Sequence, residues 1–290
     1  MKQETKQGMG REDILKDVLP KDYQLNLSDF ALFLSVMKMK EAYESVLSII
    51  LDETDLKLKE VKVEQVVLNK SGKRAIRLDA WAVDMQERQF DMEMQNDSNG
   101  DDVRKRSRFY QGLIDSPALK SGKETRYKHL PSTVIIFITQ DDIFGRDLAK
   151  YTFRERCEEL PDLSLDDGTS KIFLNMSSFH GRKELVSLLQ YMKNTRLDNP
   201  DIIVRDERIR RLDKIVEEVR ESEEWEAVQM NIMEIAMERG LKLGMEQGME
   251  QGIERGIEQG LVQGIQRGRE ENLIKDVGSV MKNFNIDLQR

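Results

Sequence analysis

Residues 77–95 read RLDAWAVDMQERQFDMEMQ, and they predict two β-strands joined as a hairpin. The polar residues at 84–87 separate two runs in which apolar and polar side chains alternate, a pattern typical of strands with one buried face. Alternate residues of a strand share a face, so Glu93 and Gln95 point the same way. The opposite face of that strand carries Phe90, Met92 and Met94. One face of the hairpin is therefore apolar, and the other carries polar groups.

The turn predicts which residues of the two strands lie opposite each other. Antiparallel pairing about a turn centred near Gln86 sets Asp79 across from Glu93, with Cβ atoms about 4.5 to 5.5 Å apart. Two carboxylates this close on a covered face repel each other unless a cation lies between them. Mg²⁺ and Mn²⁺ prefer such oxygen ligands and serve phosphate chemistry. The alternative is that both side chains face solvent on an exposed side of the sheet.

The other elements predict an α/β sandwich around one mixed sheet. They are one or two helices over 29–51, strands over 60–68, 74–83 and 88–95, a helix over 101–119, strands over 132–139 and 171–176, and a helix over 181–193. The first three strands are joined by short polar turns, the first of them at Asn69–Gly72, and this predicts an antiparallel meander. Helices and strands in this order form layers on a single sheet.

Three segments are expected from the composition along the chain. Residues 1–20 are polar and end at Pro20, so they predict a poorly ordered lead-in. Residues 21–198 hold the predicted sheet, and residues 199–290 are a charged helical segment with a tail. The chain has 290 residues, which suits one substantial domain with such an appendage.

The tail contains a four-residue repeat. Glycine recurs at every fourth position from 240 to 268, and an apolar residue follows most of these glycines. Each glycine costs about 0.8 to 1 kcal/mol relative to alanine in a helix, so an isolated helix of this sequence should be marginal. Close approach of another helix would offset that cost, which predicts self-association or a protein partner. The alternative is a partly helical, flexible tail without a defined partner.

Composition narrows the protein class. The chain is 39% hydrophobic and 34% charged, lacks a long apolar run, and does not begin with the apolar stretch of a signal peptide. These features predict a cytoplasmic protein with no membrane segment. The single cysteine, Cys157, excludes an internal disulfide, and no CxxC motif or histidine cluster is present for zinc.

Charge gives a mixed indication about nucleic acid. A net charge of −8 argues against nonspecific coating of nucleic acid. A local basic cluster is nevertheless present, made of Arg104, Lys105, Arg106 and Arg108. It is either a phosphate-binding surface or a solvated face of a helix.

The quoted hairpin also resembles a known family. With VRKRSRFYQGLID (103–115), STVIIFITQDDIFG (132–145) and the MEQGMEQGIERG tail repeats, it is similar to the Rpn-type recombination-promoting nucleases and transposases of the PD-(D/E)xK superfamily. The resemblance covers roughly residues 20–195. It implies a restriction-endonuclease-like mixed sheet flanked by helices.

The resemblance also implies roles for acidic residues and a glutamine. Asp79 and Glu93 match the metal ligands, and Gln95 stands where the wider superfamily usually has lysine. A neutral amide can only exchange hydrogen bonds, so more charge stabilisation falls on the metal and on nearby arginines. Glu41 matches an acid on the first helix, with Glu44 as its competitor.

A basic helix and an overall activity follow from the same resemblance. Arg106 and Tyr110 match the family's R…Y pattern, four residues apart on one helix face, and with Arg104 they are expected to contact DNA. The alternative pairs arginine with Asp101 or Asp102 and packs the tyrosine on the sheet. The implied activity is a Mg²⁺-dependent DNA endonuclease, with Mn²⁺ as a substitute, that hydrolyses phosphodiester bonds during recombination or mobile-element activity. The alternative is an inactive DNA-binding or oligomerisation module of the same fold.

Overall fold

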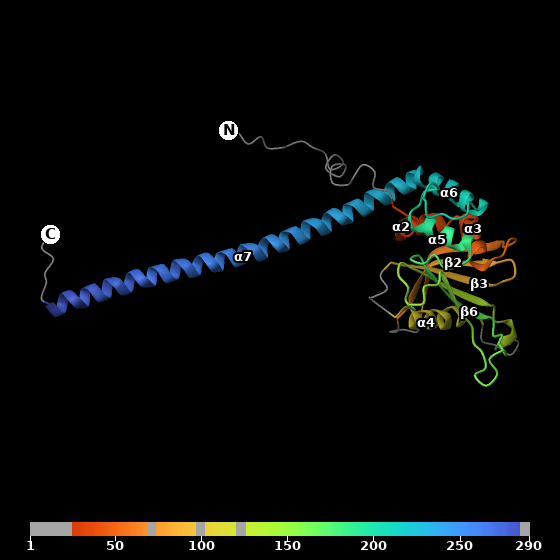
Figure 1. Cartoon of the computed structure of the whole chain (residues 1–290), viewed down its shortest axis with the longest axis horizontal. Coiled ribbons are helices and arrows are strands. Elements are labelled where there is room, and N and C mark those ends of the chain that lie inside the picture. Colours follow the sequence, from red (N-terminus) through yellow and green to blue (C-terminus); the bar gives the residue numbers. More distant parts are fainter. Residues whose placement is uncertain (1–24, 69–73, 97–101, 120–125, 285–290) are drawn as a thin grey trace. The chain divides into compact units, whose positions relative to one another are not determined.

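The computed structural model describes residues 25–68, 74–96, 102–119 and 126–284 (Figure 1). The expected lead-in over 1–20 and the predicted turn at Asn69–Gly72 lie outside these residues. The chain divides into two compact units, of which the first ends at Val228 and the second begins at Gln229.

The first unit is built on a six-stranded mixed sheet. Its strands are β1 (Leu58–Val67), β2 (Ile76–Asp84), β3 (Gln89–Gln95), β4 (Thr133–Thr139), β5 (Lys150–Phe153) and β6 (Thr169–Asn175). The spatial order is β1-β2-β3-β4-β6-β5. Strands β1, β2 and β3 form the predicted antiparallel meander, while β3, β4 and β6 run parallel and β5 is an antiparallel edge. The mixed sheet flanked by helices confirms the expected fold class. Strand β5 was not predicted, because its four residues are too few for a periodic pattern.

Helices cover both faces of the sheet (Figure 1). The helices of the described residues are α2 (Phe30–Met37), α3 (Lys40–Leu51), α4 (Val103–Asp115), the short 3-10 helix η1 (Tyr127–His129), α5 (Lys183–Lys193), α6 (Glu207–Arg220) and α7 (Glu223–Phe284). Helix α4 begins at Asp102, whose carboxylate accepts the backbone N–H groups of Arg104 at 3.1 Å and Lys105 at 3.3 Å. It ends at Asp115, earlier than the predicted 119, because Pro117 has no backbone N–H with which to continue the helical hydrogen bonds.

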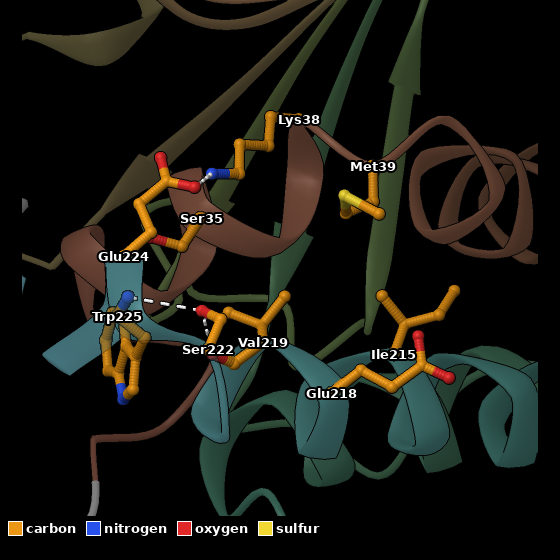
Figure 2. Close-up of a pocket in the computed structure, with 9 residues that line it drawn as sticks. All are labelled: Ser35, Lys38, Met39, Ile215, Glu218, Val219, Ser222, Glu224 and Trp225. Carbon is orange, nitrogen blue, oxygen red and sulfur yellow. Dashed lines mark hydrogen bonds and ion pairs between the residues drawn. The ribbon is translucent and has the colours of Figure 1, made fainter.

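Helix α6 packs into the first unit, although the sequence suggested a boundary at residue 198. Its Ile215 and Val219 line a hollow that is closed on the other side by Met39 (Figure 2). Trp225, at the start of α7, is buried beside them. This apolar packing explains why the compact unit extends to Val228.

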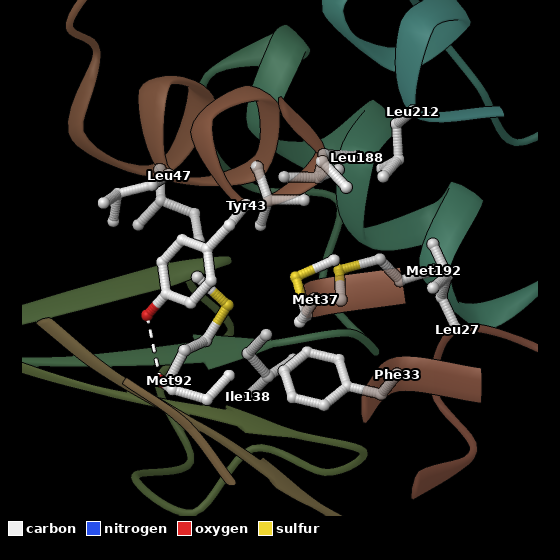
Figure 3. Close-up of a cluster of buried hydrophobic side chains, with 14 of the residues drawn as sticks. Leu27, Phe33, Met37, Tyr43, Leu47, Met92, Ile138, Leu188, Met192 and Leu212 are labelled. Carbon is white, nitrogen blue, oxygen red and sulfur yellow. Dashed lines mark hydrogen bonds between the residues drawn. The ribbon is translucent and has the colours of Figure 1, made fainter. Parts of the chain in front are cut away.

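The larger core lies on the sheet face covered by α2, α3, α5 and α6. Phe33, Tyr43 and Met92 meet there without exposure to solvent (Figure 3). The hydroxyl of Tyr43 donates a hydrogen bond to the carbonyl oxygen of Ala80 at 3.0 Å, so its burial leaves no polar atom unsatisfied. This face is stabilised mainly by apolar contacts.

The smaller core lies on the face covered by α4. Tyr110 and Ile114 of α4 pack there against Ile135 and Phe137 of β4. All seven residues of β4 are buried, because both of its faces are covered. The smaller core leaves room beside it for the polar side chains of β3.

The second unit consists of most of α7, a helix that spans 62 residues from the first unit onward and includes the glycine repeat. The sequence allowed either a helix that packs against a partner or a partly helical, flexible tail, and the structure shows one continuous helix. Among the described residues, no helix is long and apolar enough to cross a membrane.

Candidate active site

Two carboxylates meet where strands β2 and β3 part. Paired residues run from Val83 and Gln89 to Ala80 and Met92, which is the register that the turn predicts. One step further, the backbone N–H of Asp79 donates to Oε1 of Glu93 at 2.8 Å, and the N–H of Met94 donates to Oδ2 of Asp79 at 3.1 Å. The carboxylates thus take the place of backbone ladder bonds.

Both carboxylates are buried. Asp79 is 6% exposed and Glu93 is fully covered. The structure therefore places Asp79 and Glu93 together on a covered face, and the alternative in which both face solvent is wrong.

Arg106 reaches this pair from α4, the helix that covers this face of the sheet. Its Nη2 forms an ion pair with Oε2 of Glu93, and its Nη1 donates to Oε1 of Gln95 at 2.7 Å. Its Nε donates to the Tyr110 hydroxyl at 3.0 Å, and the guanidinium lies 4.9 Å from the Tyr110 ring centroid and 5.3 Å from that of Phe137. The structure thus gathers Glu93, Gln95, Arg106 and Tyr110 into one network.

Arg104 lies outside this network. Its side chain is exposed and pairs with Asp102, the residue that caps α4, at 3.1 Å. The alternative paired Arg106 with Asp101 or Asp102. Asp101 lies outside the described residues, Asp102 pairs with Arg104, and Arg106 pairs with Glu93. Contact between Arg104 and DNA stays a prediction.

A third carboxyl group was missed by the sequence analysis. Asp91 is fully buried, and within the described part of the chain neither of its oxygens has a hydrogen-bond partner. It lies two residues before Glu93 on the same strand, and therefore on the same face. The alternation of Asp91, Glu93 and Gln95 in FDMEMQ was the available signal.

Burial and mutual repulsion shift the acidity of these three groups. Burial raises the pKa of Asp79 to about 6. Burial and then the charge of Asp79 raise the pKa of Glu93 to about 7, although Arg106 opposes the shift. Burial, followed by the charges of Glu93 and Asp79, raises the pKa of Asp91 well above its usual range. The site therefore holds more negative charge than Arg106 alone offsets whenever these groups ionise.

Glu41 and Glu44 lie in a different place. Both belong to α3 and border a surface pocket shared with α6, on the side of the sheet opposite α4. Glu44 accepts the backbone N–H of Leu58 at 2.9 Å, and Glu41 is exposed in the first turn of α3, where a negative charge favours the helix N-terminus. The structure does not bring Glu41 to Asp79 and Glu93, because the sheet lies between them.

The donor set suits a hard divalent cation. Asp79 and Glu93 supply carboxylate oxygens, and Gln95 supplies an amide oxygen. Across the described ranges no three His, Cys, Asp or Glu side chains form a metal-binding group. Mg²⁺ is often held by one or two carboxylates, with waters and substrate phosphates filling its other positions. A buried, repelling pair of carboxylates fits that mode of binding.

The fold and the acidic pair define an α/β protein of the restriction-endonuclease-like class. A comparison with protein-family models matches residues 26–239 to the PD-(D/E)XK nuclease family transposases. Because this match spans most of the chain, the protein belongs to that family. Comparisons with the curated proteins and with the solved structures found no match.

Proposed function

We propose that this protein is a divalent-metal-dependent DNA endonuclease that hydrolyses phosphodiester bonds. The observation that carries the proposal is the buried pair of Asp79 and Glu93 at the point where β2 and β3 part. Membership of a nuclease family supports hydrolysis as the reaction class. Mg²⁺ is the proposed ion, with Mn²⁺ as its substitute, and the word transposase in the family description supports a setting in recombination or mobile elements.

Each residue of the network has a proposed role. Asp79 and Glu93 would hold the cation, which when bound polarises a phosphate and makes water more acidic. Gln95 is neutral, so it orients water or a phosphate oxygen through hydrogen bonds alone. Arg106 would bind phosphate with two N–H groups of its planar fork, and Tyr110 supports that fork through its hydroxyl and its ring.

Plasmid cleavage tests this proposal. Supercoiled DNA is incubated with the full chain and Mg²⁺, Mn²⁺ or EDTA, and nicked product is measured for the wild type, Asp79→Asn and Glu93→Gln. We expect metal-dependent nicking that falls at least about a hundredfold in either variant, because each loses a charged ligand. The amides retain an oxygen acceptor for the backbone N–H groups, which alanine would leave unpaired.

A matched control separates loss of a ligand from a general loss of charge. Glu60→Gln changes an exposed glutamate of β1 that pairs with Lys62 and should leave nicking unchanged. Glu41→Gln should also leave nicking unchanged, since the structure places Glu41 across the sheet. Equal activity in the wild type and in both site variants would overturn the proposal. DNA binding without any cleavage would support the noncatalytic module instead.

We further propose that residues 229–284 of α7 associate with a second copy of the same helix. The apolar side chains that follow the glycines of the repeat are each more than half exposed, and they are Leu241, Met245, Met249, Ile253, Ile257, Leu261 and Ile265. Among the described residues, the Cβ position of each repeat glycine meets only open space. A helix with so many glycines and no packing partner is marginal, so contact with another helix would stabilise it.

Light scattering of the full chain tests this association. Ile253→Glu places a charge in the apolar row, whereas Gln251→Glu makes a similar change outside it. We expect the first variant to lower the molar mass of the assembly and the second to leave it unchanged. A monomeric wild type at micromolar concentration would contradict self-association. Because the repeat lies in the second unit and Asp79 and Glu93 lie in the first, deletion from Gly240 onward should abolish assembly and leave DNA nicking unchanged.

A further inference from the structure

Arg106 occupies the acidic site in a way that bears on metal binding. Its guanidinium contacts both Glu93 and Gln95, and its side chain is only 23% exposed. It is therefore a partly buried cation lying against a proposed ligand of a second cation. A metal ion and a guanidinium both need the negative charge of Glu93, so the two cations compete for this carboxylate.

We propose that Arg106 is the internal counter-ion of the metal-free site, and that a divalent cation displaces it from Glu93 and so releases its guanidinium for a DNA phosphate. This inference rests on the proposed function, because it assumes a cation between Asp79 and Glu93. It adds a sequence of events to that function: the cation binds first, and the guanidinium of Arg106 then becomes available to bind a phosphate.

The two oxygens of Glu93 carry the first step of the argument. Oε1 accepts the backbone N–H of Asp79, and Oε2 pairs with Arg106. The bond at Oε1 replaces a ladder bond between β2 and β3, so giving it up would leave a buried N–H unpaired. Oε2 is therefore the oxygen that a cation can take at the smaller cost, and a cation bound there competes with Arg106 for the charge of that oxygen.

Electrostatics carries the second step. Two positive ions about 4 Å apart repel each other strongly at the effective dielectric constant of a protein surface. A divalent cation beside Glu93 would therefore push the guanidinium away. Before the cation binds, Arg106 offsets part of the repulsion among the buried carboxyl groups, which explains why a partly buried arginine is held there.

The remaining contacts of Arg106 show how its side chain can move and stay nearby. Its Nε bonds the Tyr110 hydroxyl, and its guanidinium lies over the Tyr110 ring. Tyr110 belongs to the same helix, one turn further along. These contacts do not involve the carboxylates, so they can keep the side chain of Arg106 beside the site when Glu93 binds the cation.

Mn²⁺ binding without DNA tests the inference. Calorimetric titration at pH 8 compares the full-length wild type with Arg106→Gln and with Arg108→Gln, a matched change at an exposed position of the same helix. We expect Arg106→Gln to bind Mn²⁺ at least about tenfold more tightly, because a charge-assisted competitor is lost. Arg108→Gln should match the wild type. An unchanged or weaker affinity in Arg106→Gln would overturn the inference.

Two further measurements complete the test. Arg106→Lys keeps the charge and loses the two-pronged contact, so its Mn²⁺ affinity should lie between those of the wild type and Arg106→Gln. If Arg106→Gln folds poorly, Arg106→Lys still tests the inference against the wild type. Plasmid nicking is measured separately. Tighter Mn²⁺ binding in Arg106→Gln with no nicking by the wild type would retain the counter-ion role and reject the nuclease. Nicking by the wild type with no gain in Mn²⁺ affinity in either Arg106 variant would retain the nuclease and reject the counter-ion role.

Discussion

Phe90 and Asp91 are neighbours on β3, and both are fully buried, but on opposite faces of the sheet. Phe90 lies in the large apolar core beneath α2 and α3, whereas Asp91 lies on the α4 side with Glu93 and lacks a hydrogen-bond partner among the described residues. Burial therefore stabilises the protein at one residue and costs free energy at the next. Strand β3 therefore contributes apolar contacts to the main core on one face and buried, mutually repelling carboxyl groups on the other.

The largest expected effect is the loss of packing at Phe90. Phe90→Ala should lower the free energy of unfolding by about 3 to 5 kcal/mol, because it removes a buried ring and leaves a cavity. Urea denaturation measures this, and Phe109→Ala, at an exposed ring on α4, should cost much less. Similar losses in the two variants would remove the contrast between the faces.

The pH dependence of stability tests the acidic face as a whole. The folded protein raises the pKa of Asp79 to about 6 and of Glu93 to about 7, so it binds protons more tightly than the unfolded chain does. The contribution of these groups to stability is thus fully present below about pH 4 and is lost as pH rises through about 6 to 7, by a few kcal/mol. Urea unfolding in EDTA should show this loss for the wild type relative to the double variant Asp79→Asn, Glu93→Gln. A constant difference from pH 4 to 8 would contradict the raised pKa values.

A smaller gain is expected at Asp91. Asp91→Asn should raise the free energy of unfolding by about 1 to 3 kcal/mol at pH 8 in EDTA, since it removes a fully buried carboxyl group that lies beside the charges of Glu93 and Asp79. The gain should vanish below about pH 3, where the acid is protonated in both states, because the pKa of an unfolded aspartate is about 3.9. Asp162→Asn, at an exposed loop position, serves as the control and should have little effect. A loss of stability at pH 8 would show that the carboxyl group at Asp91 contributes favourably.

The smallest effect is expected at the rim of the acidic face. Arg104→Gln should weaken DNA binding a few-fold and reduce the slope of log affinity against log salt by about 1, as for a single phosphate contact. Fluorescence anisotropy over a salt series measures both quantities. Arg196→Gln changes an exposed arginine that pairs with Asp198 in a loop and should leave the slope unchanged. An unaltered slope in Arg104→Gln would remove that residue from the DNA-binding surface.

Local rules explain which parts of the site were predictable. The turn and the two-residue period of strands were enough to place Asp79 opposite Glu93 and to assign Phe90 and Met92 to the other face. The same period also predicts that Asp91 shares the face of Glu93, but its burial depends on α4, which the alternation does not position.

Contacts between distant elements were harder to predict. The partner of Arg106 depends on how α4 lies over β3, so the sequence left pairing with Asp102 open. Glu41 was assigned by its position in a resemblance, and position along the chain does not report which side of the sheet a helix covers. Strand β5 is short and partly exposed, so it follows the tertiary structure more than its own pattern.

The exchange of backbone bonds for carboxylate bonds between β2 and β3 has an evolutionary consequence. Asp79 and Glu93 each accept a main-chain N–H of the facing strand, so selection for folding alone would tend to preserve acceptors at both positions. A descendant that had lost catalysis would then keep them for a long time. Retention of these two acids across relatives is therefore weak evidence of activity, whereas retention of Arg106, whose guanidinium cannot accept a hydrogen bond, would be more informative.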